Sequence, residues 1–183
     1  MSKKHPIVAV TGSSGAGTST VKKALEHIFF RQNIKPVVIE GDSFHRYDRI
    51  AMREAMQKAE AKGENLSHFG PKANEFETLD KLFASYGETG TGKKRLYLHS
   101  DEEAKPYAPL TAGQFTPWEE IDAGSDLMFY EGLHGLVKGE GYDVAQHVDL
   151  GVGVVPIVNL EWIQKIHRDS AERGYSAEAT VKT

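Results

Sequence analysis

The 183-residue chain has no cysteine, and this absence removes several kinds of chemistry. Without thiols there is no disulfide, no thiolate nucleophile and no zinc site built on cysteine. No apolar run approaches the roughly 20 residues needed to span a bilayer. The charged first residues lead directly into a strand-like segment, without the apolar core of a secretory signal. We therefore expect a cytoplasmic protein with no membrane attachment.

An excess of positive charge is also missing. The chain has 22 Lys and Arg residues against 26 Asp and Glu residues, which gives a formal net charge of -4 at pH 7. This balance does not favour nucleic acid or an anionic membrane as a partner. The length suits one hydrophobic core, so residues 1–183 are predicted to form a single domain.

Short apolar runs alternate with segments of helical periodicity along the chain. Strands are predicted at residues 7–11, 37–39, 96–98, 127–130 and 152–155, helices at 18–32, 48–62, 75–86 and 158–173, and a loop at 100–125. The alternation predicts an α/β fold of the P-loop NTPase type, with three αβα layers and a mainly parallel sheet. Ligands of such sheets bind at the carboxyl ends of the strands.

A glycine-rich segment between the first strand and the first helix carries the strongest functional signal. Its residues are Gly12, Ser13, Ser14, Gly15, Ala16, Gly17, Thr18, Ser19 and Thr20. The spacing matches the phosphate-binding loop G-x-x-x-x-G-K-[ST], in which backbone amides and a helix N-terminus cradle phosphates. Ser19 occupies the position whose hydroxyl binds Mg²⁺, so ATP and Mg²⁺ are the predicted cofactors. A glycine-rich turn without a ligand is the alternative.

Thr18 stands where that motif has lysine. The cation that normally neutralises the β- and γ-phosphates is therefore missing from the loop. Phosphoryl transfer depends largely on positioning and on charge stabilisation. If the chain is a kinase, the positive charge must come from another part of the sequence.

Two carboxylates follow predicted strands. Asp42 comes just after the strand at 37–39, where it can accept a proton from a substrate hydroxyl or, alternatively, cap a turn. Glu131 directly follows the strand at 127–130, as the acid of a Walker B strand does, and is a candidate Mg²⁺ ligand. Next to it, His134 either contacts substrate or bonds to the backbone of its turn.

Basic residues gather in two further places. His45 and Arg49 would share one face if residues 45–49 were helical, and they suit a sugar phosphate. Lys165, Arg168 and Arg173 lie on or near the end of the predicted helix at 158–173. They are either an ion-paired solvated stripe or part of a lid that brings the missing charge to the nucleotide.

Together these motifs resemble the bacterial phosphoribulokinases over essentially the whole chain. The resemblance is carried by Gly12–Thr20, Glu40–Arg46, Ser67–Phe69, Tyr86–Gly90, Tyr130–Gly135 and Asn159–Asp169. In that family, too, threonine replaces the lysine of the phosphate loop. The motifs are highly specific when taken together.

The resemblance implies transfer of the ATP γ-phosphate to the 1-hydroxyl of D-ribulose 5-phosphate, a step of the Calvin cycle. It implies Asp42 as general base, Glu131 as metal carboxylate and Lys165 beside the transferring phosphates. It further implies four candidates for binding the sugar phosphate or stabilising the transition-state charge, namely His45, Arg49, Arg168 and Arg173. It also implies a homo-oligomer, commonly an octamer, that responds to NADH and AMP.

Other interpretations stay open at this point. Family members continue well past residue 183, so the chain is expected to be a fragment. A related kinase of uridine or pantothenate is one alternative, although those kinases keep the lysine that Thr18 replaces. A non-catalytic nucleotide-binding fragment is another.

Overall fold

The computed structural model describes residues 4–121, 124–173 and 176–181. Its centre is a four-stranded sheet with the spatial order β2-β5-β1-β8, in which every neighbouring pair is parallel. These strands are β1 (Ile7–Gly12), β2 (Pro36–Glu40), β5 (Leu127–Gly132) and β8 (Leu150–Val154). The carboxyl ends of all four strands therefore meet at one edge of the sheet.

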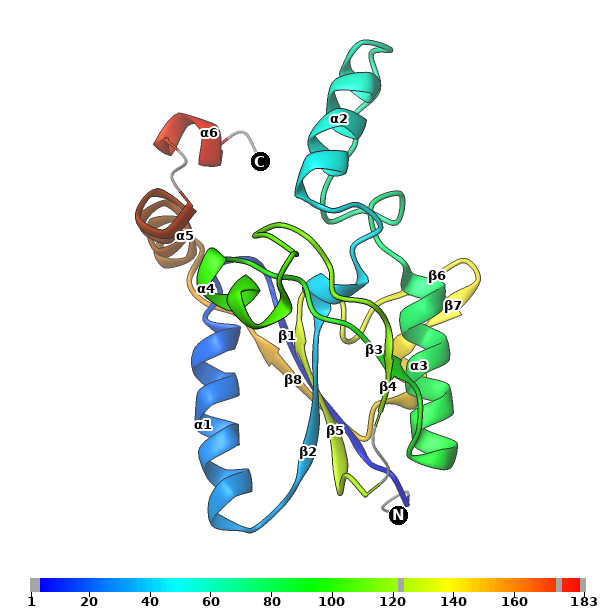
Figure 1. The fold of residues 1–183 in the computed structure, drawn as a ribbon. Coiled ribbons are helices and arrows are strands. Elements are labelled where there is room, and N and C mark those ends of the chain that lie inside the picture. Colours follow the sequence, from blue (N-terminus) through cyan, green and yellow to red (C-terminus); the bar gives the residue numbers. More distant parts are fainter. Residues whose placement is uncertain (1–3, 122–123, 174–175, 182–183) are drawn as a thin grey trace.

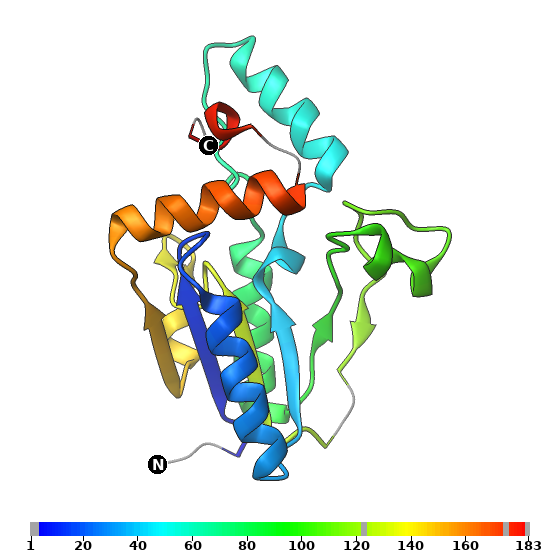
Figure 2. The ribbon, with the colours of Figure 1, turned by 90° about the vertical axis from the view of Figure 1, so that its left-hand side faces the viewer.

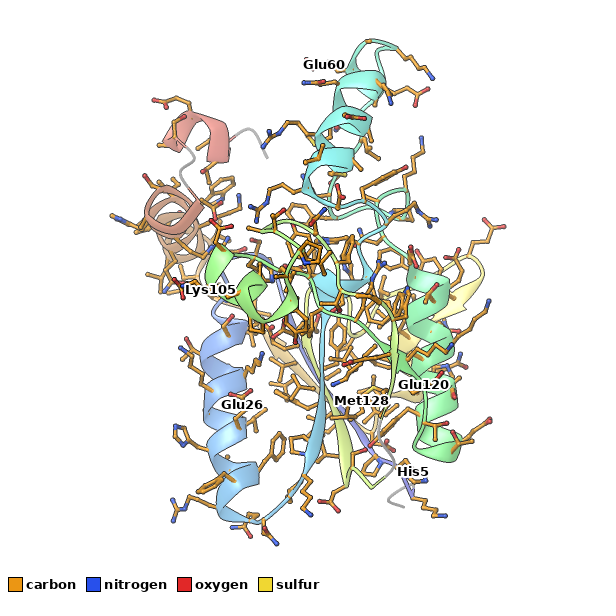
Figure 3. All side chains as sticks on the ribbon, in the orientation of Figure 1. His5, Glu26, Glu60, Lys105, Glu120 and Met128 are labelled. Atoms are coloured by element: carbon orange, nitrogen blue, oxygen red, sulfur yellow. The ribbon has the colours of Figure 1, made fainter. Side chains whose placement is uncertain are left out.

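Alternating side chains of the strands pack against helices on opposite faces of the sheet. Helix α1 (Thr18–Arg31) covers one face and α3 (Phe76–Thr89) the other (Figure 1). Val10 and Phe129 contribute to the core under α1, whereas Ile7 and Met128 contribute to the core under α3. Figure 3 shows Met128 inside the body of the molecule. This confirms the predicted α/β fold with a mainly parallel sheet.

Smaller elements surround the sheet. The helices are α2 (Arg49–Glu60), α4 (Asp101–Ala104), α5 (Val158–Arg173) and α6 (Ala177–Val181), and the 3₁₀ turns are η1 (Gly41–Phe44), η2 (Lys105–Tyr107) and η3 (Val144–His147). Two short antiparallel pairs join β3 (Lys93–Lys94) with β4 (Glu119–Glu120) and β6 (Lys138–Gly139) with β7 (Tyr142–Asp143).

Helix α2 projects beyond the carboxyl edge of the sheet, with Glu60 at its far end (Figures 1 and 3). Asp48 caps it, because its Oδ1 accepts a hydrogen bond from the Ala51 amide at 2.8 Å. Gly63, with φ of +70°, follows its end in a conformation that favours glycine. Within the described ranges, no helix is both long and apolar enough to cross a membrane.

Two predictions for residues 96–125 are wrong. Instead of a strand at 96–98, Tyr97 makes a single bridge to Phe115, and the paired strands are Lys93–Lys94 and Glu119–Glu120. The cross-strand ion pairs of these four residues, at 3.2 and 3.5 Å, favour that position. The predicted loop also contains α4, because the Ser100 hydroxyl caps its first turn.

Candidate functional site

The phosphate loop connects β1 to α1 at the carboxyl edge of the sheet. A Cβ on Gly12 would lie 2.7 Å from the Val154 carbonyl oxygen, so only glycine fits there. Gly15 and Gly17 have φ of +96° and +95°, in the left-handed region. The N-cap of α1 is Gly17, which has no side chain to bond the first amides of the helix. The loop therefore leaves the positive end of α1 available for an anion.

Helix α5 lies across this loop. In Figure 2 the helix runs above the end of β1 and the start of α1. The Ser13 hydroxyl donates a hydrogen bond to the Glu161 carboxylate, and the Arg168 guanidinium donates to the Ser14 Oγ at 3.0 Å. A Cβ on Gly15 would lie 3.1 Å from the Lys165 Cβ. The predicted helix at 158–173 is thus in direct contact with the predicted phosphate loop.

Lys165 and Arg168 of α5 share a buried carboxylate. Asp169 is 4 % exposed, and its side chain pairs with Arg168 at 2.8 Å and with Lys165 at 3.5 Å. The Lys165 amine also donates to the Thr180 carbonyl oxygen at 3.4 Å. These residues are therefore not a solvated surface stripe. The side chain of Arg173 lies outside the described part of the structure.

Lys165 also lines a cleft of about 370 Å³ beside the phosphate loop. The loop contributes Ser13 and Ser14 to the lining of this cleft, and the other lining residues are Phe69, Leu133, Glu161 and Trp162. A phosphate group held by the loop would therefore have a lysine of α5 in the same cleft. That α5 supplies the charge missing at Thr18 stays a prediction.

Two carboxylates lie side by side where β2 and β5 end. Glu40 and Glu131 are partners in the parallel register of these strands. Burial raises the pKa of Glu131, whereas a hydrogen bond from Thr18 and the charge of Lys22 oppose that rise. Thr18, at the position where a lysine is usual, thus provides a hydroxyl group to the candidate metal carboxylate.

Lys22 lies one helical turn after Thr18. Its Nζ is 2.6 Å from Glu40 Oε1, with both side chains mostly buried. Burial lowers the pKa of Lys22, but the hydrogen bond and charge of Glu40, together with the charges of Glu131 and Glu26, raise it above its ordinary value. Lys22 therefore stays charged and partly neutralises the acidic edge formed by Glu40 and Glu131.

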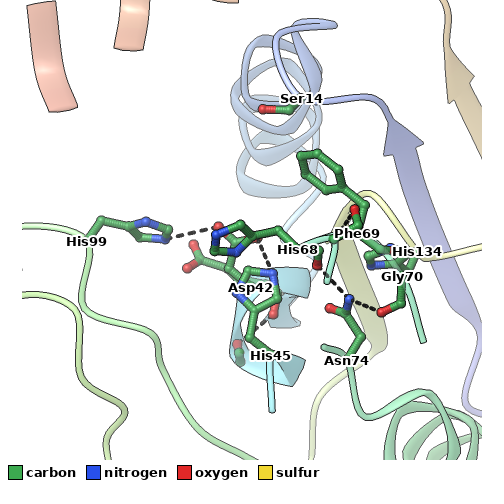
Figure 4. A network of polar contacts seen from close by, with 12 residues as sticks. Ser14, Asp42, His45, His68, Phe69, Gly70, Asn74, His99 and His134 are labelled. Atoms are coloured by element: carbon green, nitrogen blue, oxygen red, sulfur yellow. Dashed lines mark hydrogen bonds and ion pairs between the residues drawn. The ribbon is translucent and has the colours of Figure 1, made fainter. Parts of the chain in front are cut away.

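Asp42 sits in η1, directly after β2, at the same edge of the sheet. The carboxylate lies between two imidazole rings, with its Oδ1 3.6 Å from His45 Nε2 and its Oδ2 3.7 Å from His99 Nε2 (Figure 4). Burial lowers the pKa of His45, and the negative charge of Asp42 only partly opposes this. A neutral imidazole donates a hydrogen bond from one ring nitrogen and accepts a hydrogen bond at the other, which suits contacts with substrate hydroxyls.

His134 bonds to the backbone of another segment. Its Nε2 lies 3.0 Å from the Phe69 carbonyl oxygen, and its ring lies 4.7 Å from that of Phe76. The adjacent loop is held by Asn74, whose side-chain amide donates to the carbonyl oxygens of His68 and Gly70 at 2.8 and 2.9 Å (Figure 4). His134 thus helps to hold this loop beside Asp42.

Residues 45–49 are not one helix, so the condition under which His45 and Arg49 would share a helical face is not met. His45 is extended, and α2 begins only at Arg49 because Asp48 caps it. The Arg49 guanidinium donates to the His99 carbonyl oxygen at 2.9 Å. Arg49 is nevertheless close to the Asp42 surroundings, because it holds the segment that carries His99.

The guanidinium of Arg95 donates hydrogen bonds to the carbonyl oxygens of Ser43 and His45, beside Asp42. Sequence reasoning missed four residues of this region, namely Lys22, Arg95, His99 and Asp169. Asp169 was within reach, because it lies four residues after Lys165, a spacing that pairs side chains on a helix. Lys22 also could have been found, because it lies four residues after Thr18 and so on the same face of α1. Arg95 and His99 gave no signal, because they lie in an irregular segment whose position depends on tertiary contacts.

The donor set at the sheet edge suits Mg²⁺. Among the described residues, no group of three or more His, Cys, Asp or Glu could hold a metal ion by itself. Mg²⁺ is commonly held by one or two carboxylates together with substrate phosphates and water. Glu131, held by Thr18, and Ser19 at the start of α1 are hard oxygen donors of this kind.

A sequence model of the "Phosphoribulokinase / Uridine kinase family" matches residues 7–183. The chain belongs to this family. Its members include the chromosomal phosphoribulokinase of Cupriavidus necator, 56 % identical over 184 residues, and the probable phosphoribulokinase of Escherichia coli, 54 % identical over 181 residues. These matches cover 100 % and 99 % of this chain, but only 63 % and 62 % of the two relatives.

The fold comparison agrees with the family. A solved phosphoribulokinase of Rhodobacter spheroides superposes with a TM-score of 0.84 at 48 % identity, over 98 % of this chain and 61 % of that chain. A putative fructose transport system kinase from Silicibacter superposes with a TM-score of 0.68 at 18 % identity, which shows a shared fold alone. This chain of the phosphoribulokinase and uridine kinase family thus spans under two thirds of the relatives' length.

Proposed function

We propose that the protein of this chain is a phosphoribulokinase, which transfers the γ-phosphate of ATP to the 1-hydroxyl of D-ribulose 5-phosphate. The observation that carries the proposal is the meeting of the phosphate loop, Asp42, Glu131 and Lys165 at one edge of the sheet. Sequence identities of 56 % and 54 % with relatives named phosphoribulokinase support D-ribulose 5-phosphate as the acceptor, rather than uridine or pantothenate.

In this proposal the nucleotide binds with its phosphates in the loop from Gly12 to Thr20. Backbone amides and the start of α1 attract the anionic phosphates. Mg²⁺, held by Ser19, Glu131 and the phosphates, would neutralise charge as it develops on the transferred group. Lys165 and Arg168 of α5 contribute further positive charge, which the loop lacks at Thr18.

Asp42 is the proposed general base. It accepts the proton of the 1-hydroxyl as that oxygen forms its bond to the γ-phosphorus, while the bond to the bridging oxygen of ADP breaks. The two imidazoles beside Asp42 orient the acceptor through its hydroxyl groups. Arg49, His45, His134 and Arg173 are the proposed contacts of the sugar phosphate end.

Closure of α5 over the loop is part of the same proposal. Its contacts with Ser13, Ser14 and Gly15 cover the loop from the solvent side. Exclusion of water matters, because hydrolysis of ATP competes with transfer to the acceptor. Assembly into a homo-oligomer and control by NADH and AMP remain predictions from the family resemblance, and a cytoplasmic location remains a prediction from the sequence itself.

The deciding experiment measures ADP release by the chain with ATP and Mg²⁺ in the presence of D-ribulose 5-phosphate, uridine or pantothenate. We expect release above the acceptor-free rate with D-ribulose 5-phosphate alone. Faster release with uridine or pantothenate would reassign the acceptor. Nucleotide binding without release for any acceptor would support a non-catalytic nucleotide-binding role for this chain.

A further inference from the structure

Arg95 contacts the turn that carries Asp42. Its Nε donates to the Ser43 carbonyl oxygen and one of its terminal nitrogens donates to the His45 carbonyl oxygen, both at 2.8 Å. The two carbonyls flank the end of η1, directly after Asp42. One guanidinium therefore bridges two backbone carbonyls of the turn that carries the candidate base.

The guanidinium is itself held in place by aromatic rings. Its central carbon lies 3.8 Å from the ring centre of Phe115 and 4.6 Å from that of Trp118. The Trp118 ring also makes an edge contact with Phe44 of the same turn, at 5.7 Å between ring centres. These contacts fix the plane of the guanidinium, so its two hydrogen bonds have a defined direction.

The segment that follows Arg95 supplies the other side of the Asp42 surroundings. The ring of Tyr97 lies 6.0 Å from that of His45 and 4.9 Å from that of His99, and His99 is the second imidazole beside Asp42. Arg95 thus joins two segments that are far apart in sequence. One carries Asp42 and His45, and the other carries His99.

We propose that Arg95 is a positioning residue, which fixes the Asp42 turn against the His99 segment so that the base and both imidazoles face one acceptor. This inference rests on the proposed kinase function. The hydrogen-bond and ring partners of Arg95 named above include no predicted nucleotide-binding residue. Its loss therefore affects the acceptor side of the reaction and leaves the phosphate loop intact.

The test compares Arg95→Met and Arg95→Lys with Lys94→Met, a matched control that removes the neighbouring cation of β3. We expect Arg95→Met to lower kcat with D-ribulose 5-phosphate by about 10- to 100-fold, because small displacements of a reacting group are costly. The KM for ATP should change by less than about twofold. Arg95→Lys should recover little, because an ammonium cannot span two carbonyls in a plane.

Hydrogen exchange separates this inference from the proposed function. Amides of residues 41–46 should exchange faster in Arg95→Met than in the wild type, while those of β1 and α1 keep the wild-type rate. Unchanged exchange at 41–46, or an equal loss of kcat in Lys94→Met, would overturn the positioning role. If the wild-type chain transfers no phosphate, the proposed function fails, and the exchange result alone decides the role of Arg95.

Discussion

The Asp42 Oδ2 lies 3.7 Å from the His99 Nε2, although the two residues come from segments that are separated by α2 and α3. His45 approaches the other oxygen of the same carboxylate at 3.6 Å. A carboxylate between two imidazoles keeps a fixed orientation and still reaches solvent, since its side chain is 45 % exposed. It is therefore ready to meet a hydroxyl group of an acceptor.

Asp42→Asn tests the proposed base directly. The amide has the same shape but accepts no proton, so turnover with D-ribulose 5-phosphate should fall by about 100-fold or more. Nucleotide affinity, measured by calorimetry with ADP and Mg²⁺, should stay within about twofold because Asp42 is not part of the phosphate loop. Near-normal turnover would remove Asp42 from the mechanism.

Lys165→Met tests the charge supplied by α5. We expect kcat to fall far more than nucleotide affinity, because a charge that acts on the transferring phosphate is needed mainly in the transition state. The assay is ADP release at saturating ATP, together with nucleotide binding. An unchanged kcat would mean that another cation replaces the missing lysine at Thr18.

Gly15→Ala and Gly17→Ala form a matched pair. Both substitutions place a side chain at positive φ, which costs about 1–2 kcal/mol. Of the two, only Gly15 faces α5, since a Cβ there would be 3.1 Å from the Lys165 Cβ and 3.2 Å from the Glu161 carbonyl oxygen. Within the described residues, a Cβ on Gly17 would meet no non-adjacent neighbour within 4 Å. We therefore expect only Gly15→Ala to change the fluorescence of Trp162 on α5. Equal changes in both variants would argue against the packing of α5 on the loop.

Lys22→Met tests the acidic edge. It leaves Glu40 without its partner beside Glu131, and we expect the free energy of unfolding to fall by about 1–3 kcal/mol in urea titrations. The double variant Lys22→Met with Glu40→Gln should recover part of this loss. Lys23→Met, at an exposed position of α1, is the control and should cost less than about 0.5 kcal/mol. A loss in Lys23→Met as large as in Lys22→Met would contradict the ion pair's role.

His45 gives a pH dependence of stability. Its pKa is lowered by burial, so below the ordinary histidine pKa of about 6.5 the unfolded chain takes up a proton that the folded chain does not. Stability should therefore fall as the pH drops from about 7 toward the folded-state pKa, and His45→Gln should lose less over that interval. Urea unfolding at about pH 7 and at a pH below about 6.5 measures this difference in stability. His27→Gln is the control for loss of an exposed imidazole. A larger loss in His45→Gln would reverse the inferred sign.

Local patterns in the sequence predict the central architecture well. The apolar runs of β1 and β5 and the periodicity of α1 are strong because the apolar side chains of these elements pack in the core. Helix α5 differs, since its Leu160, Trp162 and Ile163 are exposed. The phosphate loop follows from its glycines. Sequence alone could not give the insertion of β5 between β2 and β1, because strand order depends on long-range packing.

The surroundings of Asp42 were less predictable for a similar reason. Arg95 and His99 lie in irregular backbone. Hydrogen bonds to carbonyls and contacts with Phe115 and Trp118 hold Arg95, whereas the ring of His99 packs against Tyr97. No periodic pattern encodes such contacts. Likewise, the carboxylate partner of Lys165 could be suspected from spacing, but its burial could not.

The position of β5 has a consequence for how the protein acquires its shape during synthesis. β5 contacts β1 and β2 on its two sides, with Ile7 opposite Met128 and Pro36 opposite Leu127. The ribosome therefore releases the phosphate loop and the Asp42 turn long before the strand that joins them. Because such distant pairings close slowly, we infer that the nascent chain gains its nucleotide-binding edge late, only once residues 127–132 have emerged.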